Sequence, residues 1–130
     1  MKKLIIFLLA IASFAAIEWQ NDFYKAHEAS LKSGKPLFVF IERHNPPCRW
    51  CQLMKKRTLG DEEIANYINE NFIPVKLVRE KRDYPKELYP KYVPTIYVIK
   101  GQKVIKRVVG YWPKSDFLSD IEDLKRALEK

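Results

Sequence analysis

Five consecutive apolar residues, Leu37-Phe38-Val39-Phe40-Ile41, constrain the fold of this 130-residue chain more than any other feature. A strand with one face in water alternates apolar and polar residues, whereas a strand buried on both faces is apolar throughout. Residues 37–41 therefore predict a central strand that is covered on both sides. A chain of this length is expected to form one domain around it.

Helical and strand patterns alternate along the rest of the chain. Further strands are expected over residues 72–78, 95–99 and 104–109, the last two forming a hairpin. Helices are expected to begin at Asn21 or Asp22, Cys48, Asp61, and Ser115 or Asp116, with a short one over 84–89. The apolar side of the first helix is expected to hold Phe23, Ala26, His27 and Leu31. The chain is thus predicted to be α/β, with a central mixed β-sheet flanked by helices.

The first fifteen residues have the pattern of a secretory signal peptide. Lys2 and Lys3 precede an apolar stretch, residues 4–16, that is interrupted only by Ser13. Small residues at positions 13 and 15 predict cleavage after Ala15, leaving residues 16–130 as the mature domain. The apolar stretch of roughly 13 residues is shorter than the ~20 that span a bilayer, which argues against an uncleaved anchor. The mature chain is therefore expected to be periplasmic or secreted, where disulfides persist.

The chain is basic, with a formal net charge of +8 from 24 Lys and Arg against 16 Asp and Glu. Loss of Lys2 and Lys3 with the signal would leave 22 against 16, or +6. Such a charge favours acidic partners or an anionic membrane surface. The densest basic run, Lys55-Lys56-Arg57, is interpreted as a solvated helix face. No groove-reading motif is present, so no nucleic-acid partner is expected.

The only two cysteines, Cys48 and Cys51, allow several chemistries. A purely structural disulfide would close a loop of four residues and add little stability. A zinc site normally has four ligands, of which the two cysteines supply half, and neither His27 nor His44 has standard ligand spacing. A homodimer that shares four cysteines is one alternative, and a metal held by Cys48 and Cys51 is another. Haem attachment is excluded because Gln52 stands where that motif needs histidine.

Redox exchange is favoured by the position of the cysteine pair. Cys48 follows the buried strand and opens a helix, where free backbone N–H groups and the helix dipole stabilise a thiolate. Cys51 follows one helical turn later on the same side, within reach of a mixed disulfide at Cys48. Arg43, His44 and Arg49 add positive charge nearby. The pKa of Cys48 is therefore expected to lie below the ~8.5 of a free cysteine.

Three motifs form a specific combination: Cys48-Arg49-Trp50-Cys51 after the apolar strand, Val93-Pro94-Thr95 opening a later strand, and Gly110 closing the hairpin. This combination resembles the thioredoxin superfamily, and most of all its exported thioredoxin-like branch with an N-terminal helical extension. The resemblance covers nearly all of residues 17–130. It implies a thioredoxin fold and the activity of a thiol–disulfide oxidoreductase.

The resemblance also implies roles for individual residues. Cys48 would be the attacking nucleophile and Cys51 the resolving thiol, so that the dithiol needs no organic cofactor. Pro94 would be a cis-proline that faces the cysteines, and Val93 would help to bind the substrate backbone. Trp50 is interpreted as an exposed apolar contact for partner chains, with packing against the fold as the alternative. Packing in the core or at its rim is expected for Trp19, Tyr111 and Trp112.

Two departures from thioredoxins matter. Thioredoxins carry a buried acid on the central strand behind the second cysteine. In this chain residues 38–41 are apolar, and the first acid after them is Glu42. We interpret Glu42 as a surface charge at the strand end, the alternative being a displaced proton carrier. The dipeptide between the cysteines is Arg49-Trp50 instead of Gly-Pro, and this dipeptide tunes the redox potential. The direction of electron flow is therefore not carried over.

The function hypothesis is an exported enzyme that reduces disulfides in exported proteins. The chain lacks the large helical insertion of DsbA-like oxidases, which favours reduction, and a reductant in an oxidising compartment needs an electron donor, expected to be a membrane reductase. An isomerase would need a dimerisation domain, and the chain has none. The alternatives are an oxidant that introduces disulfides and a non-catalytic protein that binds metal or a partner.

Overall fold

A computed structural model describes residues 16–129 of the chain. The expected signal peptide, residues 1–15, lies outside the described residues. No helix in the described range is long and apolar enough to cross a membrane.

The helices and strands follow the predicted order. They are α1 (Phe23–Ser33), β1 (Leu37–Glu42), α2 (Arg49–Leu53), α3 (Glu62–Asn71), β2 (Ile73–Val78), β3 (Thr95–Lys100), β4 (Lys103–Val109) and α4 (Lys114–Leu128). Short turns complete the list: the π-helical η1 (Met54–Thr58), which continues α2, and the 3₁₀ turns η2 (Arg79–Lys81) and η3 (Lys86–Leu88). The expected helix over 84–89 is thus a single 3₁₀ turn, and η2 was not predicted.

The last helix begins earlier than the sequence pattern predicts. Its N-cap is Pro113, whose backbone is extended, rather than Ser115 or Asp116. Proline fixes its own φ at a value that suits a helix start, and the Phe117 N–H then donates to the Pro113 carbonyl at 3.0 Å. Phe117 and Ile121 are the buried residues of this helix, at helical spacing as expected.

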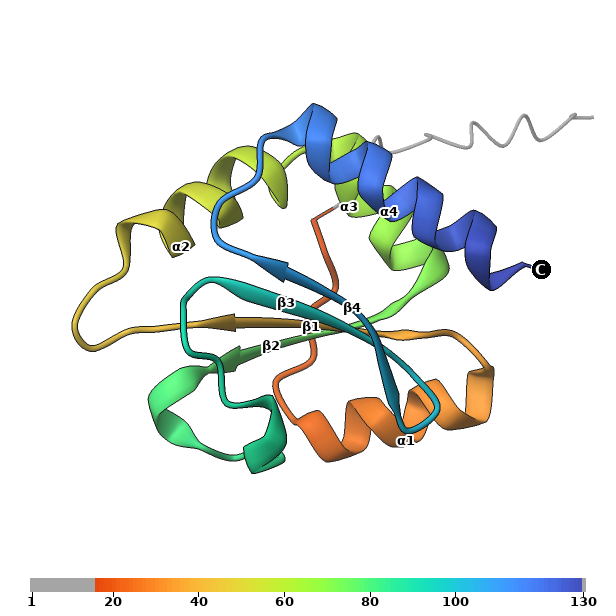
Figure 1. Ribbon diagram of the computed structural model, residues 1–130, viewed down its shortest axis with the longest axis horizontal. Coiled ribbons are helices and arrows are strands. Elements are labelled where there is room, and N and C mark those ends of the chain that lie inside the picture. Colours follow the sequence, from red (N-terminus) through yellow and green to blue (C-terminus); the bar gives the residue numbers. More distant parts are fainter. Residues whose placement is uncertain (1–15, 130) are drawn as a thin grey trace, which may run out of the picture.

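The four strands form one mixed sheet in the order β2-β1-β3-β4. β1 pairs with β2 in parallel and with β3 antiparallel, and β3 and β4 form the predicted hairpin. Helix α1 lies on one face of the sheet, and α2, α3 and α4 lie on the other (Figure 1). The predicted α/β architecture, a mixed sheet flanked by helices, is confirmed.

Strand β1 is buried along its whole length, as predicted. Phe38 and Phe40 belong to the apolar cluster under α2–α4, where Phe38 meets the rings of Trp19, Phe72 and Phe117. Leu37, Val39 and Ile41 belong to the second cluster, under α1. Both faces of β1 thus carry core side chains, which is why the run has no polar residue.

Leu31 was expected on the apolar side of α1, but half of its surface is exposed, at 50%. The buried line of this helix runs through Phe23, Ala26 and Ser30, at the spacing of one helical face. Ser30 occupies the buried position because its hydroxyl donates to the Lys35 carbonyl at 2.5 Å. Asp22 caps the helix through the backbone N–H groups of Tyr24 and Lys25.

Truncation of Phe38 is expected to destabilise the fold strongly, whereas truncation of Leu31 is not. Phe38→Ala empties a site that is fully buried, so the free energy of unfolding should fall by about 3–5 kcal/mol. Leu31→Ala should change it by less than about 0.5 kcal/mol, because the side chain is half in water. Urea unfolding of the two variants checks this, and equal losses would contradict the assigned burial.

Candidate functional site

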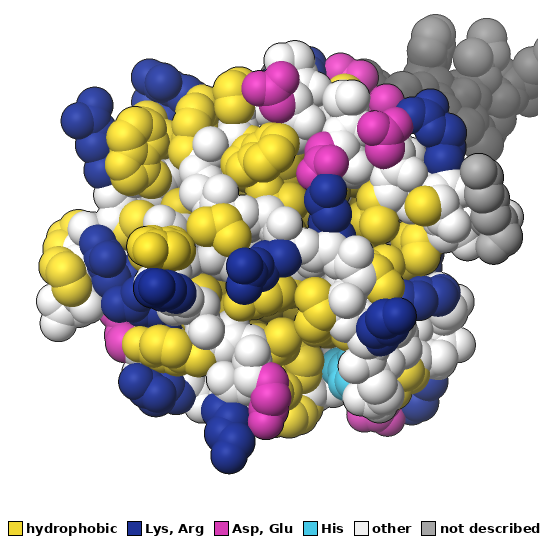
Figure 2. All heavy atoms as spheres, in the orientation of Figure 1, with side chains coloured by type: hydrophobic (Ala, Val, Ile, Leu, Met, Phe, Trp, Pro, Cys, Tyr) yellow, Lys and Arg dark blue, Asp and Glu magenta, His cyan; other side chains and the backbone are white. Residues whose placement is uncertain are grey.

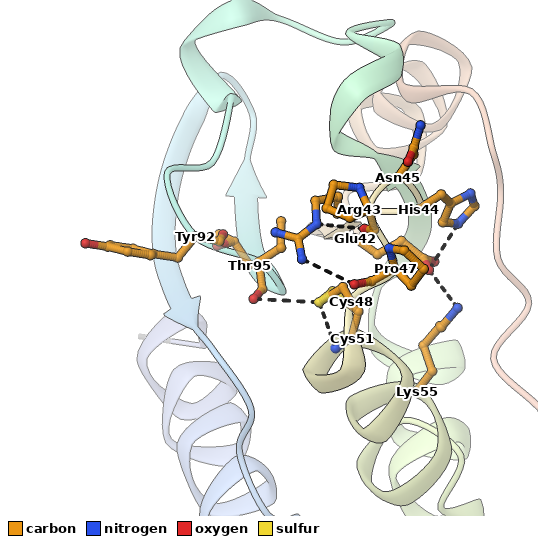
Figure 3. Close-up of a disulfide and its surroundings, with 12 residues drawn as sticks. Glu42, Arg43, His44, Asn45, Pro47, Cys48, Cys51, Lys55, Tyr92 and Thr95 are labelled. Carbon is orange, nitrogen blue, oxygen red and sulfur yellow. Dashed lines mark hydrogen bonds and ion pairs between the residues drawn. A yellow bond between two sulfur atoms is a disulfide. The ribbon is translucent and has the colours of Figure 1, made fainter.

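The cysteine pair lies at the start of α2, after the loop that follows β1. Cys48 is the N-cap of α2, with an extended backbone, and Cys51 lies in the first turn. The two residues form a disulfide, with their Cα atoms 5.2 Å apart. The Cys51 backbone N–H donates to Cys48 Sγ at 3.2 Å (Figure 3). A helix start offers N–H groups of this kind to a sulfur that becomes a thiolate on reduction.

The two sulfurs differ in access. Cys51 is 0% exposed, whereas Cys48 is 4% exposed and is the only one of the pair that borders the surface. Cys48 Sγ lies 4.0 Å from the Val93 carbonyl oxygen. The Val93–Pro94 peptide bond is cis, as predicted. The cis-proline segment therefore lies against the accessible sulfur.

Hydrogen bonds at both ends hold this cis-proline segment. The Gly110 N–H donates to the Pro94 carbonyl at 2.8 Å, and the Thr95 hydroxyl donates to the Tyr92 carbonyl at 2.5 Å. Gly110 has φ +86°, a conformation that glycine adopts without penalty. The glycine that closes the hairpin thus also anchors the cis-proline segment.

Two charged side chains hold the loop before Cys48, and one of them, Glu80, was not predicted to lie there. Arg43 folds back along the loop and donates to the carbonyl oxygens of Pro46 and Pro47, at 2.8 and 3.4 Å. The Glu80 carboxylate, from η2, accepts the backbone N–H groups of His44 and Asn45, at 3.0 and 2.6 Å. A second cis peptide bond, Asn45–Pro46, lies within this loop and was not predicted.

Glu42 is not the surface charge that was expected, because its residue is only 1% exposed. β1 extends one residue beyond the apolar run, where Glu42 pairs with Val78, so its side chain shares the covered face of Phe38 and Phe40. Its Oε1 accepts the Lys55 ammonium at 2.6 Å and lies 3.2 Å from His44 Nε2. The burial contradicts the surface-charge interpretation, and the alternation along β1 could have predicted it.

The second carboxylate oxygen of Glu42, Oε2, is buried and makes no hydrogen bond to the described part of the chain. Glu42 also lines a cavity of about 330 Å³. The other polar side chains that line it are Asn21, His44, Lys55, Lys76, Lys81 and Asp83. The buried carboxylate thus faces a polar space beside the loop of residues 43–47, which we call the redox loop.

The geometry agrees with comparisons to known proteins. A family model, Thioredox_DsbH, described as "Protein of unknown function, DUF255", matches residues 5–124. The chain belongs to the DUF255 family. The fold also matches a solved "DsbH Oxidoreductase" with a TM-score of 0.67 and 19% identity, covering 89% of this chain and 90% of that one. A thioredoxin from Thermus thermophilus matches with a TM-score of 0.70 and 18% identity, covering 84% and 87%. The predicted thioredoxin fold is confirmed.

Relatives of the DUF255 domain include much longer proteins. The uncharacterized protein B0495.5 of Caenorhabditis elegans is 29% identical over 79% of this chain, which spans only 12% of that protein. Spermatogenesis-associated protein 20 of Rattus norvegicus is 30% identical over 59% of this chain and 10% of its own length. Anterior gradient protein 3 of Mus musculus is similar in size, with 29% identity over 86% of this chain and 72% of that protein.

Aromatic side chains surround the DUF255 cysteine pair. Trp50 is 55% exposed, and its ring lies 5.9 Å from that of Tyr111. Tyr111, Trp112 and Trp19 are partly buried against the core, as expected. Tyr92, next to the cis-proline segment, is 60% exposed and points away from the fold (Figure 3). The sequence analysis missed Tyr92, although its position two residues before Pro94 was visible.

Neither histidine joins the cysteines. His27 Nε2 lies 2.7 Å from the Gly101 carbonyl, at the turn of the β3–β4 hairpin, and His44 pairs with Glu42. Within residues 16–129 no group of three or more His, Cys, Asp and Glu side chains is arranged to hold a metal ion.

The Glu42–Lys55 ion pair is expected to stabilise the packing of β1 against η1, which continues α2. Lys55→Met would leave a carboxylate buried without its nearest cation, which should lower the free energy of unfolding by about 3 kcal/mol. Adding Glu42→Leu should recover most of that loss, because no buried charge is then left. Lys56→Met, at an exposed lysine, is the matched control and should have little effect. Additive losses in the double variant would contradict the pairing.

Glu80 is expected to make the redox loop sensitive to acid. Hydrogen bonds from its own backbone N–H and from those of Asn45 and His44 hold the pKa of Glu80 below its ordinary value of 4.5, although burial opposes them. Because the pKa is lowered in the folded state, Glu80 adds stability above pH 4.5 that is lost as the pH falls through the lowered pKa. Glu80→Gln should flatten that acid limb of the stability curve. Unchanged acid sensitivity relative to Glu87→Gln, an exposed control, would contradict this.

Proposed function

We propose that this chain is an exported thiol–disulfide oxidoreductase that reduces disulfides in other exported proteins. One observation carries the proposal: Cys48 and Cys51 form a disulfide at the start of α2 in which only Cys48 borders the surface, beside the cis-Pro94 segment. This asymmetry suits a pair in which one sulfur exchanges with the substrate and the other resolves the complex.

The reaction would proceed in two exchanges. The Cys48 thiolate of the reduced protein attacks one sulfur of the substrate disulfide, that bond breaks, and the other substrate sulfur leaves as a thiolate that takes up a proton. Cys51 then loses its proton and attacks Cys48 Sγ, which closes the Cys48–Cys51 bond and releases the second substrate thiol. Two electrons pass to the substrate, and a dithiol donor reduces the protein again.

Glu42 is the candidate acceptor for the Cys51 proton. Its carboxylate is buried at the end of β1, under the helix that carries Cys51, and its partner Lys55 lies one turn after Cys51 on that helix. The polar cavity that Glu42 lines would let the proton exchange with solvent. A buried acid near a reacting thiol acts as a general acid and base when proton transfer accompanies the exchange.

The proposed direction is reduction. Only residues 59–61 connect η1 to α3, so within residues 16–129 the fold carries no large helical insertion of the kind found in DsbA-like oxidases. Sustained reduction in an oxidising compartment would draw electrons from a membrane reductase partner. The rival proposal is an oxidant, which a strongly stabilised Cys48 thiolate would favour.

Export is proposed from the sequence of residues 1–15. If the signal is cleaved as expected, the protein recovered from the periplasm of an expressing bacterium should begin at Ala16. Amino-terminal sequencing checks this. Recovery of the full-length chain in the cytoplasmic fraction alone would contradict export.

Activity is expected in the reduction of insulin by dithiothreitol. Cys48→Ser should abolish the acceleration, because it removes the attacking sulfur, and Cys51→Ser should accumulate a mixed disulfide with the substrate. The reduction potential should lie near the value of about −270 mV typical of thioredoxin, while one near about −120 mV would indicate the oxidant.

Lys103→Gln, at the far end of the sheet, is the control for the cysteine variants and should retain activity. If the wild type forms no disulfide at any buffer redox potential and carries stoichiometric metal, the non-catalytic metal-binding alternative replaces this proposal.

A further inference from the structure

Two segments that meet at the disulfide carry no acidic residue. Residues 43–60 contain no Asp or Glu, and neither do residues 88–115, so all 16 acids of the chain lie elsewhere. The basic residues of these segments are Arg43, Arg49, Lys55, Lys56, Arg57, Lys91, Lys100, Lys103, Lys106, Arg107 and Lys114. The net positive charge of the chain therefore lies in the two segments that contain the cysteine pair and the cis-proline, since the rest of the chain has 13 basic residues against 16 acidic ones.

Part of this charge is paired internally. Lys55 binds Glu42, Lys106 binds Asp120, and Lys114 binds Asp61 and Glu63. Lys100 and Lys103 lie at the hairpin turn, at the opposite end of the sheet from Cys48. Six basic side chains remain. Lys56 and Arg57 lie further along the chain, in η1, and Arg107 lies in β4 opposite Tyr97. The three that flank the accessible sulfur and the cis-proline segment in sequence are Arg43, Arg49 and Lys91.

Aromatic surface lies between these charges. Trp50 and Tyr92 are the large exposed apolar side chains on the two sides of Cys48, and Tyr111 supports Trp50 from the end of β4. Together with the three cations they form what we call the Cys48 rim: Arg43, Arg49, Trp50, Lys91, Tyr92 and Tyr111. Figure 2 shows dark-blue basic side chains beside yellow ones on the left, where α2 begins in Figure 1, while a group of magenta acids lies at the upper right near α4.

We propose that the Cys48 rim binds extended, acidic polypeptide segments that carry an apolar side chain next to the target cysteine. The inference rests on the proposed function and adds the class of substrate. Opposite charge attracts and orients an acidic segment, and exposed aromatic rings bind apolar side chains at low entropic cost. Because Cys48 is only 4% exposed, the partner sulfur has to approach closely along the rim, which suits an extended segment more than a disulfide inside a compact protein.

The exchange itself is unchanged by this choice of substrate. The Cys48 thiolate attacks the peptide disulfide, the peptide leaves as two thiols after Cys51 closes the protein disulfide, and dithiothreitol supplies the two electrons in the assay. The rim acts before that step, by raising the fraction of encounters in which the peptide disulfide lies against Cys48.

Binding is tested first, without redox chemistry. Three synthetic peptides share an apolar residue beside a serine that replaces the cysteine, and differ only in flanking Glu, Gln or Lys residues. The change in tryptophan fluorescence on titration should give an affinity at least about fivefold higher for the Glu peptide than for the Gln peptide. The preference should shrink between about 20 mM and about 500 mM salt, because surface charges are screened.

Variants then assign the preference to the rim. Arg49→Gln with Lys91→Gln should remove the preference for the Glu peptide, whereas Lys103→Gln, a lysine at the far end of the sheet, should retain it. Tyr92→Ala should weaken binding of all three peptides and leave their ratio unchanged. Equal affinities for the Glu and Gln peptides, or a preference that survives the double variant, would overturn the inference.

Turnover separates this inference from the proposed function. The corresponding peptide disulfides are compared with hydroxyethyl disulfide, which is small and uncharged. Turnover of hydroxyethyl disulfide without any preference among the peptides leaves the enzyme proposal standing and overturns the substrate class. Charge-selective binding without turnover of any disulfide supports the rim and overturns the enzyme proposal.

Discussion

Burial of β1 on both faces is the constraint on which the rest of the structure depends. A strand that is apolar throughout has to lie between two layers, and α1 on one side and α2–α4 on the other supply them. The loop after its carboxyl end leads to Cys48, the N-cap of α2, and to Cys51 within that helix. The antiparallel pairing of Ile41 with Thr95 brings the start of β3, and with it cis-Pro94, to the same edge. The strand register thus brings the two segments of the site to one edge of the sheet.

The redox loop separates two electrostatic environments. Behind the loop, the buried Glu42 pairs with Lys55 and His44. At the surface, the exposed Glu80 accepts backbone N–H groups of the loop. On the outer side, the accessible segments carry only basic charge. Both carboxylates, of Glu42 and Glu80, thus have partners inside the protein, and Arg43 donates to carbonyl oxygens of the loop. Arg49 and Lys91 form no ion pair within residues 16–129 and are the rim charges that a partner would meet. The basic charge of the chain therefore has a local meaning that the net value of +8 conceals.

The difference between the two cysteines follows from ordinary helix geometry. An N-cap residue lies half outside its helix, so Cys48 faces the cis-proline segment, whereas Cys51 lies one turn inside and packs against the core. The arrangement needs no cofactor to distinguish the two sulfurs. Because Cys51 is 0% exposed, its proton would need an internal acceptor in the proposed reaction, and Glu42 beside its polar cavity is the candidate.

The sequence by itself determined the main helices and strands, their order and the cysteine pair at a helix start, because periodicity, capping and motif spacing are local properties. The cis-proline was predicted from the resemblance to thioredoxins. The sequence did not determine whether Glu42 is exposed or buried. That depended on β1 continuing one residue past its apolar run and on α2 and η1 covering that residue. Glu80 accepts a backbone N–H of the redox loop although it lies 36 residues further along the chain. On α1, Ser30 is buried instead of Leu31, and its hydroxyl donates to the Lys35 carbonyl. Such contacts are decided only by tertiary packing, since burial is a property of the neighbours that a residue acquires on folding.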